Sequence, residues 1–334
     1  MPERSAINQT IQIGVETTPG TPVAATKTLG SIGFAMGINV DSTTSRPTGQ
    51  KYASQHIVGK EWTAADISGN PSYEELPYLF SSLFSSPEIV PVTEDGGTGA
   101  ATKWVFDTKS FGDDAPKTFT IEQGSSFRAH RASSAIISEL NIEWSRDEIS
   151  LGGSAFARAI EDGITMTPNP TGFKQIPVKP DQLSVYLDDS ADMLGNTKLT
   201  RALEGEMSVS DRFSPLWVVD RDLPSFASIV EGEPSVEFTI RQMADEQAME
   251  NLLAMRGGAT KFFRAEWVGP IIFGTGPTAT RYSFVFDMAG QVSDVDNFDE
   301  TDGVFSIEWT FGAVHDSTWG KAMHAEVVNT QTAL

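Results

Sequence analysis

The feature that most constrains this fold is an order of predicted elements that occurs twice in the chain. Each half begins with a segment in which apolar residues alternate with polar or small ones, the pattern of a half-buried strand. This alternation covers 34–40 and 203–209, with Met36 and Met207 at corresponding places. The lead-in segments ATKTLGSIGFAM and NTKLTRALEGEM both carry the dipeptide Thr-Lys at the matching position. We therefore expect an internal duplication.

A long connection follows this strand in both halves, at 41–59 and 211–234. Connections of this length exceed what a tight hairpin needs, and they often carry function. Trp217 and Val218 begin an apolar run that makes full solvent exposure of the second connection costly. We expect arms that contact a partner, with Tyr52, Trp217 and Val218 as candidate contacts. A disordered tip is the alternative.

A second strand, at 62–67 and 236–240, leads in each half to one short helix, whose apolar residues form a single stripe that should lie across a sheet. Ser72 and Glu75 fit a capping box, although Pro77 also fits a later helix start. Asp245 is a candidate N-cap of the second helix, and Gly257 is a natural stop. The inner-face residues are Leu76, Leu79, Phe80, Leu83 and Phe84 in the first helix and Met249, Leu252 and Leu253 in the second.

Both halves then return to strands and close on the tripeptide Ile-Glu-Trp. We predict that Trp144 and Trp309 are core residues at equivalent positions in two final strands. Because side chains alternate along a strand, Glu143 and Glu308 should point to the opposite face. The predicted strands of this part are 103–107, 118–122 and 136–144 in the first half and 262–268, 281–288 and 304–311 in the second.

A proline-rich segment lies between the two series of elements, and such segments are typical of linkers. It divides the chain into a first domain at 1–165, a linker at 166–180 and a second domain at 181–334. The predicted class is mainly β (α+β). It comprises two tandem β-sandwich or barrel domains, each with one short flanking helix and a long loop between its early strands.

The charge of the chain limits its partners. The formal net charge is −21, and both halves carry more acidic than basic residues. Tight binding to a nucleic-acid backbone requires clustered Lys and Arg, so we do not expect it. The chain has no cysteine, and therefore no disulfide framework or thiol nucleophile. We find no membrane anchor and no signal peptide, so we expect synthesis in the cytoplasm of the producing cell.

No catalytic motif stands out. There is no G-x-S-x-G elbow, the four histidines are isolated in sequence, and EDGGTGA (94–100) lacks the Lys-Ser/Thr of a phosphate loop. The segment SDVDNFDETDG (293–303) resembles a calcium loop but lacks the central glycine and the spaced glutamate. A solvated acidic loop is the alternative there. We predict no enzyme activity, no cofactor and no metal site.

Two phrases resemble the major tail tube proteins of long-tailed, non-contractile bacteriophages (siphophages). They are IGVETTPGTPVAATKTLGSIGF in the first half and LSVYLDDSADMLGNTKLTRALEGEMSVSDRFSPLWVVD in the second. The order of elements is also similar to the tube fold, a β-sandwich with one helix and a long loop between early strands. The resemblance covers most of the chain, and the duplication points to the subgroup with two fused tube domains.

The resemblance implies a virion protein whose rings stack into a tail tube around a tape-measure protein and later conduct double-stranded DNA. Three two-domain chains would form a pseudo-hexameric ring, with a homohexamer as the alternative. Tail terminator and tail-tip proteins would be further partners, and the termini (1–12 and 319–334) would reach neighbouring rings. Glu143, Glu308, Glu204 and Glu206 are candidate acidic residues of the pore or the exterior. The alternatives are a tube-like or adaptor component of another injection or secretion machine, and a carbohydrate-binding β-sandwich adhesin.

Overall fold

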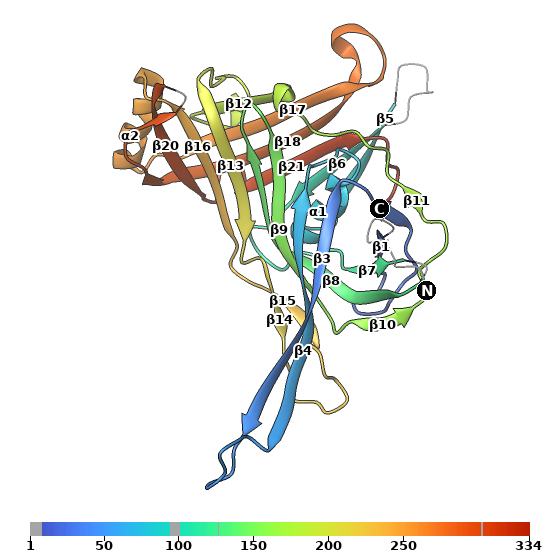
Figure 1. Ribbon diagram of the computed structural model, residues 1–334. Coiled ribbons are helices and arrows are strands. Elements are labelled where there is room, and N and C mark those ends of the chain that lie inside the picture. The colour runs from blue at the N-terminus through green and yellow to red at the C-terminus, as the bar shows by residue number, and fades with distance from the viewer. Residues whose placement is uncertain (1–8, 94–100, 126, 302) are drawn as a thin grey trace.

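The computed structural model describes residues 9–93, 101–125, 127–301 and 303–334, and the chain is mainly β, as the sequence predicts (Figure 1). Its described residues contain two α-helices, α1 (Leu76–Leu83) and α2 (Glu246–Gly257). The strands of the first half are β1 (Thr10–Val15), β2 (Lys27–Leu29), β3 (Ile32–Ser45), β4 (Gln55–Gly69), β5 (Glu88–Val92), β6 (Ala101–Asp107), β7 (Phe119–Gly124), β8 (Ala129–Trp144), β9 (Ile149–Ala157), β10 (Glu161–Ile164) and β11 (Thr171–Gly172). Those of the second half are β12 (Leu183–Asp188), β13 (Ala202–Ser210), β14 (Phe213–Leu216), β15 (Ser228–Glu231), β16 (Ser235–Met243), β17 (Lys261–Phe273), β18 (Thr280–Val295), β19 (Asp299–Thr301), β20 (Val304–Ala313) and β21 (Met323–Asn329).

One sheet runs through both halves, and we call it the shared sheet. Its order is β3, β4, β9, the end of β8, β13, β16, β20 and the end of β18, all antiparallel. The halves join at β8 and β13, where the pairs run from Gly205 opposite Trp144 to Val209 opposite Leu140. The two halves are therefore linked by backbone hydrogen bonds between strands as well as by the chain between them.

A rear sheet lies behind each half of the shared sheet. In the first half it contains β11, β2, β1, β7, the start of β8 and β10. In the second half it contains β12, β17, the start of β18, β21, β6 and β5. The long strands β8 and β18 each pass from the rear sheet into the shared sheet. Because β5 and β6 come from the first half, the two halves interlock.

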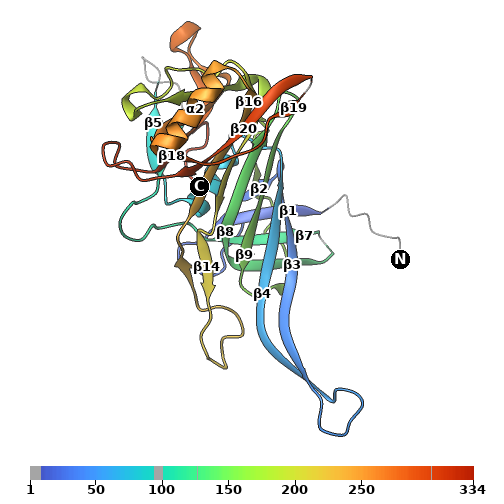
Figure 2. The same cartoon turned by 90° about the vertical axis from the view of Figure 1, so that its left-hand side faces the viewer.

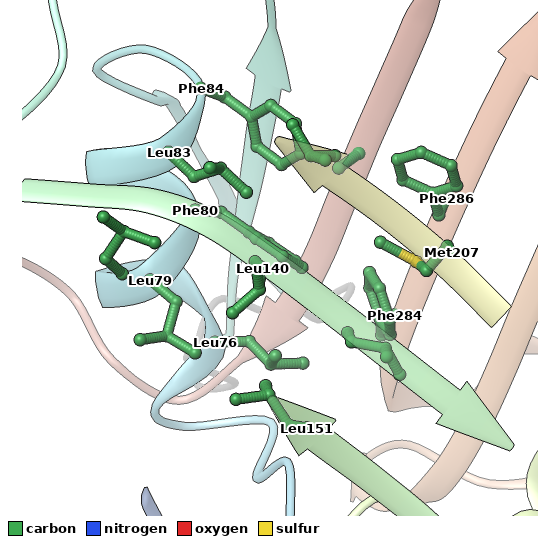
Figure 3. Close-up of a cluster of buried hydrophobic side chains, with 14 of the residues drawn as sticks. Leu76, Leu79, Phe80, Leu83, Phe84, Leu140, Leu151, Met207, Phe284 and Phe286 are labelled. Carbon is green, nitrogen blue, oxygen red and sulfur yellow. The ribbon is translucent and has the colours of Figure 1, made fainter. Parts of the chain in front are cut away.

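Helix α1 lies between the layers, and all eight of its residues are buried (Figure 3). Its rings meet strands of both halves, since Phe80 lies 5.6 Å from Phe106 and 5.3 Å from Phe284 between ring centroids. The prediction of a single apolar stripe is therefore wrong for this helix. The predicted capping box is also wrong. The Glu75 side chain makes no cap, and instead its carboxylate accepts hydrogen bonds from the backbone N–H groups of Gly30 (2.9 Å) and Ser31 (3.1 Å).

Helix α2 begins and ends as predicted. The Asp245 carboxylate caps the N-terminus by accepting from the Ala248 N–H at 3.0 Å, and the helix ends at Gly257 before a left-handed Gly258. Its inner face differs from the prediction, because Leu253 is 69% exposed whereas Ala248, Asn251 and Ala254 are buried. Met249 and Leu252 pack at the rim of the core, as predicted.

The strand pairings of the two halves repeat. The order β3–β4–β9–β8 matches β13–β16–β20–β18, and β1 pairs with β7 as β12 pairs with β17. A bulge fixes the alignment between the halves. Ser138 is the bulged residue of β8 and Ser293 that of β18, and each Oγ donates to the facing backbone carbonyl at 3.2 Å, in Ser154 and Thr310 respectively. The repeated pattern supports duplication of the chain.

The repeated Ile-Glu-Trp is a coincidence within this duplication. Trp144 lies in β8, which matches β18, whereas Trp309 lies in β20, which matches β9. The prediction that the two tryptophans are equivalent is therefore wrong. The prediction that both belong to the core is confirmed, since Trp144 is 5% and Trp309 0% exposed.

The first long connection is an arm rather than an irregular loop. Strands β3 and β4 continue as a twisted ribbon that projects from the body, with pairs as far out as Ser45 and Gln55 (Figures 1 and 2). The predicted irregular segment at 41–59 is thus mostly strand. The second connection folds back, forms the small sheet of β14 and β15, and lies beside the base of the arm.

The segment between the halves is packed against the first half. β11 pairs with β2, Phe173 and Val178 are buried, and Pro177 bridges to Ser72, so 166–180 is not a free spacer. The C-terminal segment 319–334, which we expected to reach neighbouring rings, instead supplies β21 as a central strand between β18 and β6. The predicted turn at 94–100 and most of the N-terminal extension at 1–12 lie outside the described residues, and β1 begins at Thr10.

Candidate functional site: an acidic face of the shared sheet

The outward face of the shared sheet is acidic where the two halves meet. We call this region, formed by the outward residues of β13, β16 and β20 together with Asn141 and Glu143 of β8, the acidic face. Each of these strands alternates apolar residues inward with polar residues outward, so its charged side chains gather on one side. The charged residues of the acidic face are Glu143, Glu204, Glu206, Glu237, Arg241 and Glu308.

Two glutamates face each other across the junction of the halves. Glu206 on β13 is the register partner of Glu143 on β8, and like charges directly opposite each other destabilise a sheet. Asn141 lies one step along β8 on the same face, and its Nδ2 donates to Glu143 Oε1 at 3.0 Å. Burial and the neighbouring Glu143 raise the pKa of Glu206, whereas hydrogen bonding from Asn141 acts in the opposite direction. The face therefore concentrates negative charge at some cost to the fold.

A single arginine offsets part of this charge. Arg241 Nη2 lies 2.8 Å from Glu308 Oε2, and Nη1 lies 3.2 Å from Glu204 Oε1. The three residues sit side by side on β13, β16 and β20, because Arg241 is the register partner of both glutamates. Glu143, Glu206 and Glu237 have no cation among the charged residues of the face defined above. Five glutamates against one arginine leave this face strongly negative.

The structure brings together all four glutamates that the sequence singled out. Glu143, Glu204, Glu206 and Glu308 line one hollow of about 410 Å³ on the acidic face, together with Glu148. Their assignment to a pore or to an exterior surface stays a prediction. Sequence reasoning missed Glu237 and Arg241. The alternation of SVEFTIRQM, in which Val236, Phe238 and Ile240 point inward, contained the signal for both.

The face continues onto the first half with small side chains. Most outward positions of β3, β4 and β9 carry small or polar residues, namely Gly33, Ala35, Gly37, Ala64, Asp66, Ser68, Gly152 and Ser154. Toward the arm, Trp62 of β4 and Phe156 of β9 also point outward, and their rings contact Trp217 and Phe226 of the second connection. Glu139 of β8 joins them through a hydrogen bond from Ser154 Oγ at 3.3 Å. Away from Trp62 and Phe156, this part of the sheet has no basic or large apolar side chain among the outward positions named, and its surface there is formed by small and polar residues.

The three candidate loop contacts lie in different settings. Tyr52 is 72% exposed near the tip of the arm, and Val218 is also exposed. Trp217 is half-buried, because its ring lies 5.8 Å from that of Trp62 and 5.0 Å from Lys60 Nζ. Trp217 therefore joins the second connection to the base of the arm, and the structure does not bring it together with Tyr52.

The acidic segment 293–303, which resembles a calcium loop in sequence, contains strand in its described part. Its described part forms the end of β18 and the strand β19, and Asp294, Asp296 and Asp299 each accept a hydrogen bond from the next backbone N–H. Across the described residues, no group of three or more metal-ligating side chains could hold an ion. Among these same residues, neither helix has the length and apolar character needed to cross a bilayer.

Neither the comparison with protein-family models nor that with curated proteins finds a match to this chain.

Proposed function

We propose that this protein is a structural subunit whose copies form stacked rings of a phage tail tube, with the acidic face lining the channel. The observation that carries the proposal is the shared sheet. One side buries the core of both halves, and the other carries mainly small and polar residues and is acidic where the halves meet, although the second connection covers Trp62 and Phe156 near the arm. Such a wall suits a channel through which DNA passes without binding.

The charge of this wall suits DNA that slides. Proteins bind DNA mainly when Lys and Arg neutralise phosphates and release counterions. The acidic face has five glutamates and a single arginine, already engaged by Glu204 and Glu308, so it offers phosphate no partner. Like charge would keep the duplex away from the wall, and the small side chains at Gly33, Gly37 and Gly152 would leave that part of the wall smooth.

The duplicated pairing supports a ring built from few chains. Two equivalent sheet segments already join side by side within one chain, so three chains would supply six such segments. The tape-measure protein would occupy the channel before DNA, and tail terminator and tail-tip proteins would close the ends of the tube. The arm of β3 and β4 would contact a neighbouring ring.

Electron microscopy of the purified protein tests this proposal. Rings or tubes with an axial channel lined by Glu143, Glu206 and Glu237 are expected. Particles that stay monomeric across protein concentration, salt and pH, or a channel lined mainly by Lys and Arg, would contradict it. Mass measurement of one ring would distinguish three chains from six.

A further inference from the structure

A hollow of about 390 Å³ lies at one end of the rear sheet of the second half. Strand β12 ends and β17 begins at this place, and the turn that precedes β21 forms a further side. The hollow shares no residue with the one on the acidic face. Its size is in the range of sites for small molecules, so its chemistry shows which ligand it suits.

The two loops that form the hollow are held by their own hydrogen bonds. In the turn before β21, Asp316 Oδ1 accepts from the backbone N–H groups of Thr318 at 3.0 Å and Trp319 at 2.6 Å. In the loop after β12, the buried Asp188 carboxylate accepts from the backbone N–H of Thr197 at 2.9 Å. Both loops therefore keep their shape without a ligand, which lowers the entropic cost of binding one.

Trp319 supplies an aromatic wall to this hollow. Its half-buried ring packs edge-on against the buried Phe262, with ring centroids 6.0 Å apart, and Lys321 Nζ lies 5.7 Å from its centroid. The indole N–H of Trp319 has no hydrogen-bond partner in the described part of the chain. The ring therefore offers a ligand both an apolar surface and a donor at its edge.

Several polar groups of the hollow are also without a partner. The hydroxyl groups of Ser190 and Thr318 and the carboxylate of Asp192 make no hydrogen bond to any other described residue. Together they supply donors and acceptors. The Asp189 carboxylate, in contrast, is paired with Lys261. With this lysine and Lys321 already beside the hollow, a neutral ligand rich in hydroxyl groups fits it better than a cation.

We propose that this hollow binds a carbohydrate. The C–H face of a pyranose ring would stack on Trp319, and its hydroxyl groups would bond to Ser190, Asp192 and Thr318. Such a ligand is apolar on one side and both donates and accepts at its rim, as the hollow requires. A single sugar should bind with a dissociation constant of about 1 mM, because it has few atoms with which to make contacts. This inference goes beyond the tube function and does not depend on it.

Saturation-transfer NMR of the full chain tests the proposal with three probes, the methyl glycosides of glucose, galactose and N-acetylglucosamine. We expect transfer to the C–H protons of at least one of them, and a loss of affinity of about tenfold or more in Trp319→Ala. The matched control is Phe298→Ala, which removes a half-exposed ring outside the hollow and should leave binding unchanged. Absence of transfer to all three glycosides, or binding that persists in Trp319→Ala, would overturn the proposal.

Asp192→Asn separates a sugar from a cation. The amide oxygen still accepts a hydrogen bond, so the affinity for a glycoside should fall by only about threefold. Tetramethylammonium that binds the wild-type protein and is lost in Asp192→Asn, with no glycoside bound, would show a cation site instead. If Trp319→Ala proves unstable on melting, Ser190→Ala with Thr318→Ala keeps the ring and should still weaken sugar binding. Rings seen by microscopy are expected whichever result is obtained, so the two proposals stand or fall separately.

Discussion

At the scale of residues, charge is arranged unfavourably in one place and favourably in another. Glu206 faces Glu143 across a strand pair, and the folded protein holds a proton on Glu206 more tightly than the unfolded chain does, because its pKa is raised. Such a carboxylate lowers stability at neutral pH, and this penalty disappears as the pH falls through its pKa. Arg212, in contrast, links the halves through a buried set of ion pairs and hydrogen bonds.

We expect Glu206→Gln to raise the melting temperature at pH 7 by about 1–2 °C. This corresponds to an increase of about 0.5 kcal/mol in the free energy of unfolding, because the substitution removes a like-charge pair on a sheet. The gain should vanish below pH 4.5, the ordinary pKa of a glutamate, where the wild-type side chain is also neutral. Melting curves as a function of pH measure this. Glu204→Gln is the control and should give no gain, since Glu204 pairs with Arg241.

Arg212→Ala should lower the free energy of unfolding by about 3–5 kcal/mol, the usual cost of removing one partner of a buried ion pair. The Arg212 guanidinium pairs with the Asp114 carboxylate, and its Nη1 lies 2.6 Å from Glu231 Oε1. It also donates hydrogen bonds to the backbone carbonyls of Leu83 and Phe84. The Asp114 side chain is fully buried and would lose its cation. Chemical denaturation measures the loss.

Arg201→Ala is the matched control for that substitution. Arg201 pairs with Asp245 at 2.9 Å, but its side chain is half exposed, so its removal should cost about 0–1 kcal/mol. Equal losses for the two variants would show that Arg212 does not bind the second connection to the first half as described.

At the scale of elements, the arm contributes little to the core. Beyond Val40 nearly all of its residues are exposed, including the apolar Ile57 and Val58. An exposed ribbon of this length that carries apolar side chains such as Ile57 and Val58 favours contact with another molecule, and its partner in the proposed tube is a neighbouring ring.

Replacement of 43–57 by Asn-Gly should leave the fold intact, because Ser42 and Val58 are register partners that a two-residue turn can join. We expect a melting temperature within about 2 °C of wild type, rings that still form, and loss of stacking into tubes. Sedimentation and microscopy measure both. Tubes of normal length would show that the arm does not join rings, and Tyr52→Ala is a milder variant of the same test.

At the scale of the whole molecule, a net charge of −21 opposes binding to polyanions, and the acidic face concentrates that charge on the proposed channel wall. We expect no binding of double-stranded DNA by the wild-type protein at low salt. A variant with Lys at positions 143, 206 and 237 should bind DNA, with an affinity that falls steeply between about 50 and 200 mM salt.

Gln at the same three positions is the control for the lysine variant. It removes the same glutamates without adding positive charge, and should remain unable to bind DNA in a gel-shift assay. Binding by the wild-type protein or by the glutamine variant would contradict a wall built to let DNA slide.

Several elements could be predicted from local pattern alone. The 203–209 alternation placed β13 and the outward side chains of Glu204 and Glu206, and Asp245 and Gly257 set the ends of α2. These features depend on the period of a strand and on capping chemistry, which act over a few residues. The burial of α1 on all sides could not be predicted in this way, because the strands that cover it come from both halves.

The sequence by itself determined a mainly β chain with a repeated order of elements, two short helices, and acidic side chains on the outward side of its strands. Only the tertiary structure decided which strands correspond, since Ile-Glu-Trp suggested one match and the bulges at Ser138 and Ser293 established another. It also decided that Glu143 faces Glu206 and that Ile38 is left uncovered. The physical reason is that alternation fixes the side of a sheet on which a residue lies, whereas its neighbour across the sheet depends on pairings between strands far apart in the chain.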